Sequence, residues 1–211
     1  MQTRTEGKLA EYLAQTFVGE DAFADVRAVG EMRHPGMQVS PYEAQVLAWL
    51  TTISGAKRIL EVGTFMGYST LYMARALPKD GHITTLEKSD EHAKIAEAHC
   101  AQDTRINVVC TDALEWIRNY KGEKFDLIFL DAEKRQYPSY LEAALPHLNP
   151  HAWVLADNSL LWGAVSGEDP SAASKEATEA MRTFNATLAD KTKFDGVLLT
   201  TPEGLTVARR R

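Results

Sequence analysis

The sequence predicts an α/β fold with a doubly wound, seven-stranded sheet that is mostly parallel, has helices on both faces and ends in an antiparallel hairpin. Short apolar runs rich in β-branched residues alternate with helical patterns between residues 58 and 156, which is typical of parallel strands covered on both faces. Two further apolar runs, 192–200 and 204–208, are separated by Thr201-Pro202-Glu203, which favours a hairpin. Together these runs predict five parallel strands and a final antiparallel pair.

Each parallel strand is expected to alternate with a helix. The strands are expected at 58–62, 82–87, 106–110, 125–130 and 152–156, and the helices at 68–77, 90–101, 113–120 and 137–148. A longer helix is expected to begin at Asp169-Pro170 and to run to about 189, because an acid followed by proline is a common helix start. Cys110 falls inside an apolar strand, so we expect it in the core.

Three helices are expected ahead of the first strand. Apolar residues at helical spacing predict one over 6–18, and a shorter one is expected over 21–29. The segment Ser40-Pro41-Tyr42-Glu43 combines an N-cap, a proline at the first helical position and the acid of a capping box, and its helix is expected to end at Ser54. We expect one domain, residues 1–211. Residues 1–55 would form helices that cap the site or bury a dimer surface, and residues 56–211 the α/β core.

The composition excludes several classes of protein. The chain has 211 residues, of which 45% are hydrophobic, so a single domain with a sizeable core is expected. Its net charge of −6 argues against nucleic-acid binding, and no apolar stretch is long enough to span a membrane. No signal-peptide pattern is found at the start, and two cysteines are too few for a disulfide framework, so a cytoplasmic setting is expected. Arg209-Arg210-Arg211 is expected to be a frayed, solvated end.

The first candidate site follows the strand at 58–62. Gly63 and Gly67 form a turn before a helix whose free N–H groups face a ligand. The G-x-G-x-x-G of dinucleotide sites is missing, and the carboxylate of Glu61 would repel a pyrophosphate. Glu87 ends the next strand 20 residues after Gly67, the spacing at which an acid binds ribose hydroxyls. A nucleoside with a cationic tail suits both acids, so S-adenosylmethionine is expected, although a glycine turn needed only for packing is the alternative.

The second candidate site lies where later strands end in acids. Asp112, Asp131 and Asp157 each follow an apolar strand, and Asn158 comes next, although a helix cap or loop start explains any one of them equally well. The strands before Asp131 and Asp157 are expected neighbours, so two carboxylates and one amide match a Mg²⁺ site with open positions. Lys134 follows Asp131 by three residues. A metal would lower its pKa and let it act as a base, whereas the alternative is an ordinary surface lysine.

Four segments resemble the cation-dependent O-methyltransferase family, which includes catechol and caffeoyl-CoA O-methyltransferases and belongs to the class I methyltransferases. They are ILEVGTFMGYSTLYMARALP, FDLIFLDAEKRQYPSYLEAALPHL, WVLADNSLLWGAV and VLLTTPEGLTVARR, and the pair LDAEK and ADN is the most specific part. The resemblance implies Mg²⁺, Mn²⁺ or another divalent cation on Asp131, Asp157 and Asn158, with Lys134 as the base. It also implies S-adenosylmethionine contacts at Met37, Val39, Glu61, Gly63, Tyr68, Ser69, Glu87, Asp112, Ala113 and Asp131.

The acceptor is less well defined by the sequence. Trp162, in a loop over 159–178, is expected either to wall the acceptor pocket or to lie in the core. Asn149-Pro150-His151-Ala152 stands where the family often has Pro-Gly-Gly, and the CoA-contacting residues of the caffeoyl-CoA branch are not matched. We therefore expect a Mg²⁺-dependent, homodimeric enzyme that methylates one hydroxyl of a vicinal-dihydroxy aromatic.

Two alternatives stay open on the same fold. An NAD(P)-dependent reductase is disfavoured because the chain lacks both G-x-G-x-x-G and a Tyr-x-x-x-Lys pair. A non-catalytic nucleoside-binding module is disfavoured because the metal trio and Lys134 are complete.

Overall fold

The structure is a computed structural model that describes residues 8–201 and 203–211. Seven strands occur in the order β3-β2-β1-β4-β5-β7-β6, and both pairs that involve β7 are antiparallel, which confirms the predicted fold class. The chain divides into two compact units, an N-terminal unit that ends at Asp112 and a C-terminal unit that runs from Ala113 to Arg211. The single domain over 1–211, with residues 1–55 capping the site, stays a prediction.

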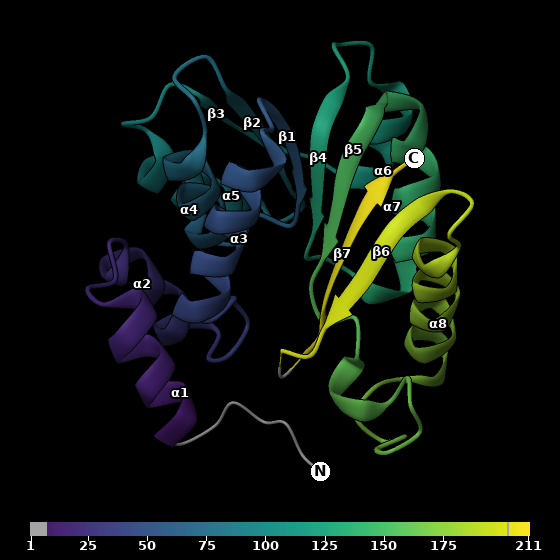
Figure 1. Ribbon diagram of the computed structural model, residues 1–211. Helices are drawn as coiled ribbons and strands as arrows, with labels where there is room; N and C mark the ends of the chain where they lie inside the picture. Colours follow the sequence, from purple (N-terminus) through teal and green to yellow (C-terminus); the bar gives the residue numbers. More distant parts are fainter. Residues whose placement is uncertain (1–7, 202) are drawn as a thin grey trace. The chain divides into compact units, whose positions relative to one another are not determined.

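The N-terminal unit contains the first three strands (Figure 1). Its elements are α1 (Lys8–Leu13), a π-helical turn η1 (Ala14–Val18), α2 (Ala24–Arg33), α3 (Pro41–Ser54), β1 (Arg58–Val62), α4 (Tyr68–Ala76), β2 (His82–Glu87), α5 (Asp90–Cys100) and β3 (Ile106–Cys110). β1 pairs with β2 and β2 with β3, both in parallel. Ile59, Leu60, Ile83 and Leu86 are fully or almost fully buried, so both inner strands lie in the core.

The start of α3 is fixed by its own side chains, as predicted. The hydroxyl of Ser40 accepts a hydrogen bond from the Glu43 N–H, and the Glu43 carboxylate accepts one from the Ser40 N–H. Pro41 occupies the first helical position, and Gly55 ends the helix in the left-handed conformation at φ 66°. The capping box therefore positions the segment just before it, which carries Met37 and Val39.

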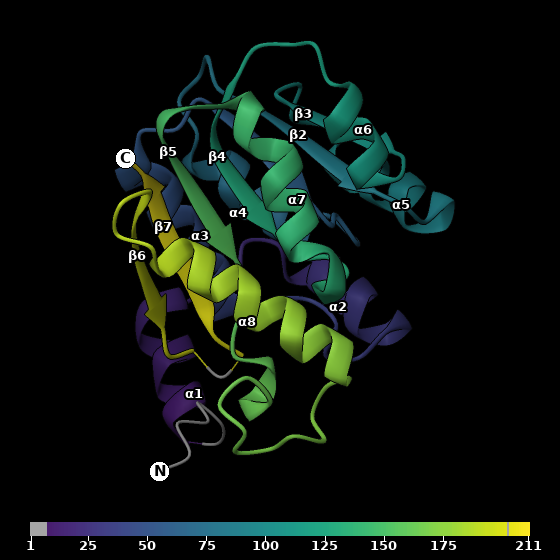
Figure 2. The same cartoon turned by 90° about the vertical axis from the view of Figure 1, so that its right-hand side faces the viewer.

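The C-terminal unit contains the other four strands (Figure 2). Its elements are α6 (Ala113–Asn119), β4 (Phe125–Leu130), η2 (Lys134–Gln136), α7 (Tyr137–Ala144), η3 (Leu145–His147), β5 (Leu148–Ala156), η4 (Leu161–Gly163), α8 (Lys175–Ala189), β6 (Phe194–Leu199) and β7 (Leu205–Arg210). α7 and α8 pack together on the same face of the strands. The buried core of this unit includes Phe129, Leu155, Met181, Phe184 and Leu188, all at most 1% exposed.

Several expected boundaries differ from the observed ones for local reasons. α8 begins at Lys175 and not at Asp169, because the Ser174 side chain caps it while the backbone of Glu168 and Asp169 turns back onto Gly163. β5 begins four residues earlier than expected, since its first part pairs with β4 before a register shift. α7 stops at Ala144, where a 3-10 turn containing Pro146 follows.

At the amino end, α2 covers Ala24–Arg33 where 21–29 was expected, and residues 6 and 7 of the first predicted helix lie outside the described residues, as does Pro202. The predicted connection between the last two strands is otherwise confirmed by their antiparallel pairing.

Two expectations about single residues are wrong. Cys110 is exposed, because β3 is an edge strand of the sheet and this end of it is open to solvent. The arginines near the end are not frayed: Arg209 and Arg210 belong to β7, and the Arg210 guanidinium donates to the carbonyls of Leu145 and Leu148. No helix among residues 8–201 and 203–211 is both long and apolar enough to cross a membrane.

Candidate active site

The turn after β1 is built on unusual backbone angles. Gly63 and Gly67 have φ of 100° and 86°, which glycine adopts without steric cost. Phe65, between them, has φ of 50°, which costs free energy for a residue with a side chain. Backbone bonds hold the turn: the Gly63 N–H donates to Leu86 O at 3.0 Å, and the Gly67 N–H donates to Thr64 O at 2.9 Å. The turn is therefore a fixed structure that links β1, β2 and α4.

Glu61 lies fully buried beneath this turn. Its carboxylate accepts hydrogen bonds from the hydroxyls of Ser69 at 2.6 Å and Thr70 at 2.5 Å, both in the first turn of α4. A carboxylate near the start of a helix is stabilised by the helix dipole as well as by these donors. Two of the predicted cofactor residues, Glu61 and Ser69, are thus brought into direct contact with each other.

Glu87 is held at the end of β2 by two backbone donors. Its Oε2 accepts from the Phe65 N–H at 2.8 Å, and its Oε1 accepts from the Ser89 N–H at 2.9 Å. His92 lies 3.8 Å from Oε1 through its Nδ1. The Glu87 carboxylate therefore has a fixed orientation beside the glycine turn, and it stabilises the strained Phe65 backbone.

Tyr68 is buried, and its hydroxyl donates to Asp21 rather than pointing to solvent. Asp21 also accepts from the hydroxyl of Tyr72, with both O–O distances 2.9 Å, and from the Arg27 guanidinium at 2.8 Å. Burial raises the pKa of Tyr68, and the hydrogen bond to Asp21 raises it further. The network ties the segment before α2 to α4, so Asp21 is a member of this region that the sequence did not single out.

The remaining cofactor predictions are spread over both units. Met37 is half-exposed at 55%, whereas Val39 is buried at 5%. Asp112 accepts from Lys88 Nζ at 3.1 Å within the N-terminal unit. Ala113 and Asp131 belong to the C-terminal unit, and their role toward a cofactor stays a prediction.

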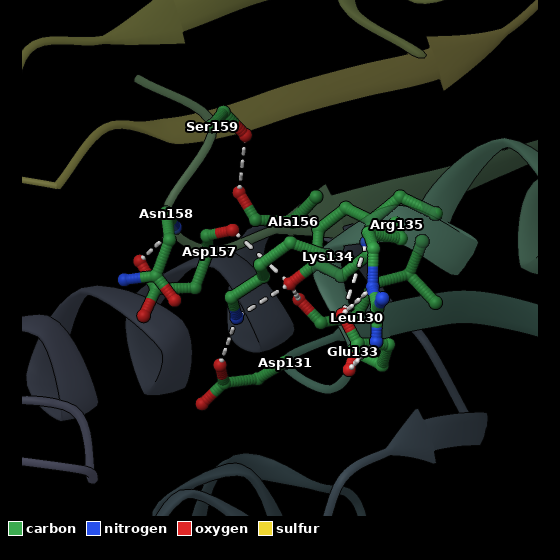
Figure 3. A network of polar contacts seen from close by, with 10 residues as sticks. Leu130, Asp131, Glu133, Lys134, Arg135, Ala156, Asp157, Asn158 and Ser159 are labelled. Carbon is green, nitrogen blue, oxygen red and sulfur yellow. Dashed lines mark hydrogen bonds and ion pairs between the residues drawn. The ribbon is translucent and has the colours of Figure 1, made fainter. Parts of the chain in front are cut away.

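The C-terminal unit has its own polar cluster at the ends of β4 and β5 (Figure 3). Lys134 Nζ donates to Asp131 Oδ1 at 2.8 Å and to the Tyr137 hydroxyl oxygen at 2.9 Å. The Tyr137 hydroxyl lies 2.9 Å from Leu130 O and 3.1 Å from Asp157 O. The predicted neighbours Asp131, Lys134 and Asp157 are therefore brought together through one tyrosine.

The register of the two strands explains this proximity. Leu130 of β4 pairs with Ala156 of β5, so Asp131 and Asp157 follow a matched pair of residues. The Asp157 N–H donates to Leu130 O at 3.0 Å, and the Asn158 N–H donates to Asp157 Oδ1 at 2.6 Å. Asp157 is 5% exposed, and Asn158 has a left-handed backbone at φ 56°. The sequence argument that parallel strands end side by side is confirmed for these two.

Electrostatics at this cluster determine the pKa of Lys134. Burial lowers the pKa of Lys134, but Asp131, Tyr137 and Asp157 raise it by more, and the net pKa lies above the usual 10.5. The lowering expected beside a bound cation stays a prediction, because without a cation the ammonium of Lys134 is itself the positive charge beside two acids. The alternative of an ordinary surface lysine is wrong, since the side chain is only 19% exposed.

The donor set suits a divalent cation in its chemistry. Asp131, Asp157 and Asn158 offer carboxylate and amide oxygens, which are hard ligands of the kind that Mg²⁺ prefers. Both acids act on Lys134, so both lie where a positive charge is stabilised. Among residues 8–201 and 203–211, no three His, Cys, Asp or Glu side chains form a metal-binding group. The predicted set differs from such a group because one of its three members is an amide.

The loop after Asn158 carries unusual strain. Leu161 and Trp162 have φ of 45° and 50°, in addition to Asn158. Trp162 is 45% exposed, so the alternative that it lies in the core is wrong. The loop is held from outside: the Asn185 amide of α8 donates to Ser159 O at 2.8 Å, and the Leu160 N–H donates to Glu203 O at 2.8 Å. Strain retained by such contacts is common at binding sites.

Tyr137 is the residue of this cluster that the sequence reasoning missed. It lies three positions after Lys134 and six after Asp131, at the start of α7. A tyrosine in the first turn of a helix directly after a candidate lysine is a weak signal, because its ring alone explains burial. Only the three-dimensional arrangement shows that its hydroxyl lies within hydrogen-bonding distance of Lys134, Leu130 and Asp157.

Comparisons with known proteins agree with the geometry. A catechol O-methyltransferase from Niastella koreensis is 34% identical over an alignment of 182 residues that covers 83% of this chain and 81% of that protein. A caffeoyl-CoA O-methyltransferase from Populus kitakamiensis is 32% identical over 83% of this chain and 79% of its own length. The crystal structure of an O-methyltransferase from Bacillus cereus in complex with SAH has a TM-score of 0.84 at 30% identity, covering 95% of this chain and 96% of that one.

The family model described as O-methyltransferase matches residues 21–211, which include every predicted site residue. This match, with relatives above 30% identity over most of the chain, does not favour the reductase or the non-catalytic alternative. The chain therefore belongs to the O-methyltransferase family, as its sequence predicts.

Proposed function

We propose that this protein transfers a methyl group from S-adenosylmethionine to one hydroxyl of an aromatic with two adjacent hydroxyls, with the help of a divalent cation. The observation that carries the proposal is the cluster at the ends of β4 and β5. There Lys134 Nζ lies 2.8 Å from Asp131 Oδ1 and also interacts electrostatically with Asp157. Family membership and the SAH complex of the Bacillus cereus relative support the methyl donor.

On the donor side, the N-terminal unit supplies residues for a charged nucleoside. Glu87 is proposed to accept from the ribose hydroxyls, because its two oxygens are held in place by the N–H groups of Phe65 and Ser89. Glu61 keeps Ser69 and the start of α4 in position, because its carboxylate accepts hydrogen bonds from the hydroxyls of Ser69 and Thr70. Gly63, Tyr68 and Ser69, with Met37 and Val39 before α3, complete the proposed contacts in this unit.

On the acceptor side, Asp131, Asp157 and Asn158 are the residues that would hold Mg²⁺ or Mn²⁺. Such a cation supplies a Lewis acid that orients two neighbouring oxygens and lowers the pKa of a bound hydroxyl. Lys134 is proposed to accept the hydroxyl proton at Nζ. A second positive charge beside Asp131 and Asp157 disfavours the ammonium form, which returns the lysine toward the neutral amine that a base requires.

The substrate class follows from coordination and from the relatives. Three protein oxygens would not complete the coordination of Mg²⁺, and a vicinal diol has two adjacent oxygens that could serve as further ligands. The relatives named above act, by their names, on catechol and caffeoyl-CoA. Trp162, exposed on its strained loop, is proposed to form part of the wall of the acceptor pocket together with Lys134. A homodimer and a cytoplasmic location are part of the same proposal, and neither nucleic acid nor membrane is expected as a partner.

Metal removal tests the function directly. Turnover of S-adenosylmethionine with caffeate should stop in excess chelator and return when Mg²⁺ or Mn²⁺ is added. Under the same conditions, calorimetric titration should show that S-adenosylmethionine binding is little changed by the chelator. Full turnover in excess chelator would contradict the proposed cation.

The acceptor is tested with matched compounds that differ by one hydroxyl. A catechol should be methylated at one oxygen. The corresponding monophenol offers the cation only one oxygen, so it would not be fixed in line with the methyl group. Because a misplacement of about 1 Å costs roughly a hundredfold, kcat/KM for the monophenol should be at least about a hundredfold lower. Comparable kcat/KM values would mean that the acceptor is not chelated.

A further inference from the structure

The hydroxyl of Tyr137 lies at the centre of the acceptor-side cluster. Tyr137 is the first residue of α7 and is fully buried, with its ring packed edge-on against Phe184 at a centroid distance of 5.3 Å. Its hydroxyl oxygen lies 2.9 Å from Lys134 Nζ, 2.9 Å from Leu130 O and 3.1 Å from Asp157 O. One phenol therefore connects the lysine to the ends of both β4 and β5.

The direction of these hydrogen bonds follows from the atoms available. The two carbonyl oxygens are acceptors only, so the single hydroxyl proton of Tyr137 is directed toward Leu130 O and Asp157 O. Lys134 Nζ is a donor, so it donates to a lone pair of the same oxygen. The hydroxyl is thus oriented by the backbone of two strands, and its free lone pair is fixed toward Lys134.

Lys134 has a second partner of a different kind. Its bond to Asp131 Oδ1 is an ion pair, and Asp131 is also a proposed ligand of the cation. A carboxylate that binds a cation has less charge available for the lysine. The bond to Tyr137 is neutral on the acceptor side and does not involve a proposed ligand side chain, so it continues to hold Nζ when Asp131 binds another partner.

We propose that Tyr137 is the positioning residue of Lys134 in methyl transfer: its hydroxyl holds Nζ at the ends of β4 and β5, where the acceptor hydroxyl is deprotonated. This inference rests on the proposed role of Lys134 as the base. A purely structural role, in which the hydroxyl only joins the two strand ends, makes different predictions.

Tyr137→Phe is the decisive variant, because it removes the hydroxyl and keeps the ring against Phe184. With S-adenosylmethionine, Mg²⁺ and caffeate, kcat should fall roughly tenfold to a hundredfold, as expected for a displaced catalytic group. The Kd values for S-adenosylmethionine and for Mn²⁺, measured by calorimetry, should stay within about twofold. The same substitution in a Lys134→Ala background should lower kcat no further, because there is no longer an amine to position.

Tyr120→Phe is the matched control. Tyr120 also lies 2.9 Å from a backbone carbonyl, that of Glu123, and stacks on the buried Phe125 at a centroid distance of 5.0 Å, at the opposite end of β4. Its hydroxyl touches no proposed site residue among those the structure describes, so Tyr120→Phe should leave kcat unchanged.

Each contrary result has a distinct meaning. Four results would each overturn the positioning role. Two concern kcat: a value within about twofold of wild type in Tyr137→Phe, or an equal loss of kcat when the substitution is made in the Lys134→Ala background. The other two are a loss of Mn²⁺ affinity in Tyr137→Phe and a Tyr137→Phe variant that no longer melts cooperatively. If Lys134→Ala itself kept full kcat, the proposed base would be wrong and Tyr137 would have nothing to position. A large loss of kcat in Lys134→Ala with no loss in Tyr137→Phe would overturn the positioning role of Tyr137 and leave Lys134 as the proposed base.

Discussion

The acids of the glycine turn and those of the β4–β5 cluster are stabilised in different ways. Glu61 and Glu87 accept from uncharged donors, namely two hydroxyls and two backbone N–H groups. Asp131 instead pairs with the ammonium of Lys134, and Asp157 acts on the same ammonium. The first pair is therefore held by uncharged groups, whereas the second pair is balanced by the positive charge of one lysine side chain.

This difference indicates two kinds of site. An acid held by two backbone donors, as Glu87 is, has an orientation set by the fold, which suits recognition of a neutral ribose. Acids that already compensate the charge of a lysine lie where positive charge is stabilised, which suits the proposed metal site. The first two predictions below test this contrast, and the other two test the stability of the structure around each site, in order from the largest expected effect to the smallest.

Lys134→Ala should have the largest effect on catalysis. Removing a general base costs roughly 10²–10⁴ in rate, so kcat should fall by about that factor while the Kd for S-adenosylmethionine stays near the wild-type value. Arg135→Ala is the control, because its exposed side chain pairs only with Glu133 among the described residues. A change in kcat of less than about threefold for Lys134→Ala would show that the lysine balances charge and does no more.

Glu87→Ala should have the opposite profile. Two hydrogen bonds from the ribose hydroxyls to a charged carboxylate contribute roughly 3 kcal/mol to the binding free energy. Without them, the Kd for S-adenosylmethionine should rise about a hundredfold. At saturating cofactor, kcat should change little. Glu97→Ala, an exposed acid on α5, should leave the Kd unchanged. Titration calorimetry that finds equal affinity for Glu87→Ala and wild type would remove Glu87 from the cofactor site.

Gly204→Ala should lower the stability of the protein more than Gly55→Ala does. Gly204 lies against Leu160 in the loop after Asn158, whereas Gly55 ends α3. Both glycines have positive φ, 85° and 66°, which costs about 1–2 kcal/mol for alanine. A Cβ on Gly204 would also lie 2.7 Å from the Leu160 nitrogen, whereas one on Gly55 meets nothing within 4 Å. Urea denaturation should give a clearly larger loss for Gly204→Ala. Equal losses would mean that the loop yields freely at Leu160.

Asp21→Asn should have the smallest effect, and it should depend on pH. Burial raises the pKa of Asp21, but hydrogen bonds from Arg27, the Phe23 N–H, Tyr72 and Tyr68 lower it by more, so the net pKa lies below 3.8. A lowered folded-state pKa stabilises the fold above 3.8 and loses that effect as the pH falls through the folded value. The variant should be less stable than wild type by on the order of 1 kcal/mol at pH 7.

That stability difference should narrow below pH 3.8, the value of an unperturbed aspartate, as Asp21 of the wild type takes up a proton. Thermal denaturation of both proteins across this range measures it. A difference that grows on acidification would contradict the assignment.

The strands and the acids that end them could be predicted because both depend on local patterns. Apolar runs specify the buried strands, and parallel strands bring their carboxyl ends to one edge, so Asp131 and Asp157 were placed together correctly. The start of α8 could not be predicted, since Asp169-Pro170 and Ser174 are both good helix starts and contacts to Gly163 select the second. The exposure of Cys110 likewise depends on strand order, which is a tertiary property.

Candidate ligands for the site could be named from the sequence, and these stay predictions, but the residues that hold them in place could not. Tyr137 and Asp21 act through hydroxyl and carboxylate bonds to residues that are distant along the chain or on another element, and neither belongs to a spacing pattern. The raised pKa of Lys134 in the metal-free protein was not predicted, because it depends on how close Asp131, Tyr137 and Asp157 lie to Nζ in the fold.

The left-handed backbone at Trp162 has a consequence for protein engineering. The loop is fastened through the backbone groups of Ser159 and Leu160, so the side chain at position 162 is free of that anchoring. A library at this position should keep the fold when it uses glycine, asparagine, aspartate or histidine, which tolerate φ near 50°, and should lose members with valine, isoleucine or threonine. Because Trp162 is proposed to wall the acceptor pocket, a change of acceptor preference should be sought with this restricted set of residues at 162.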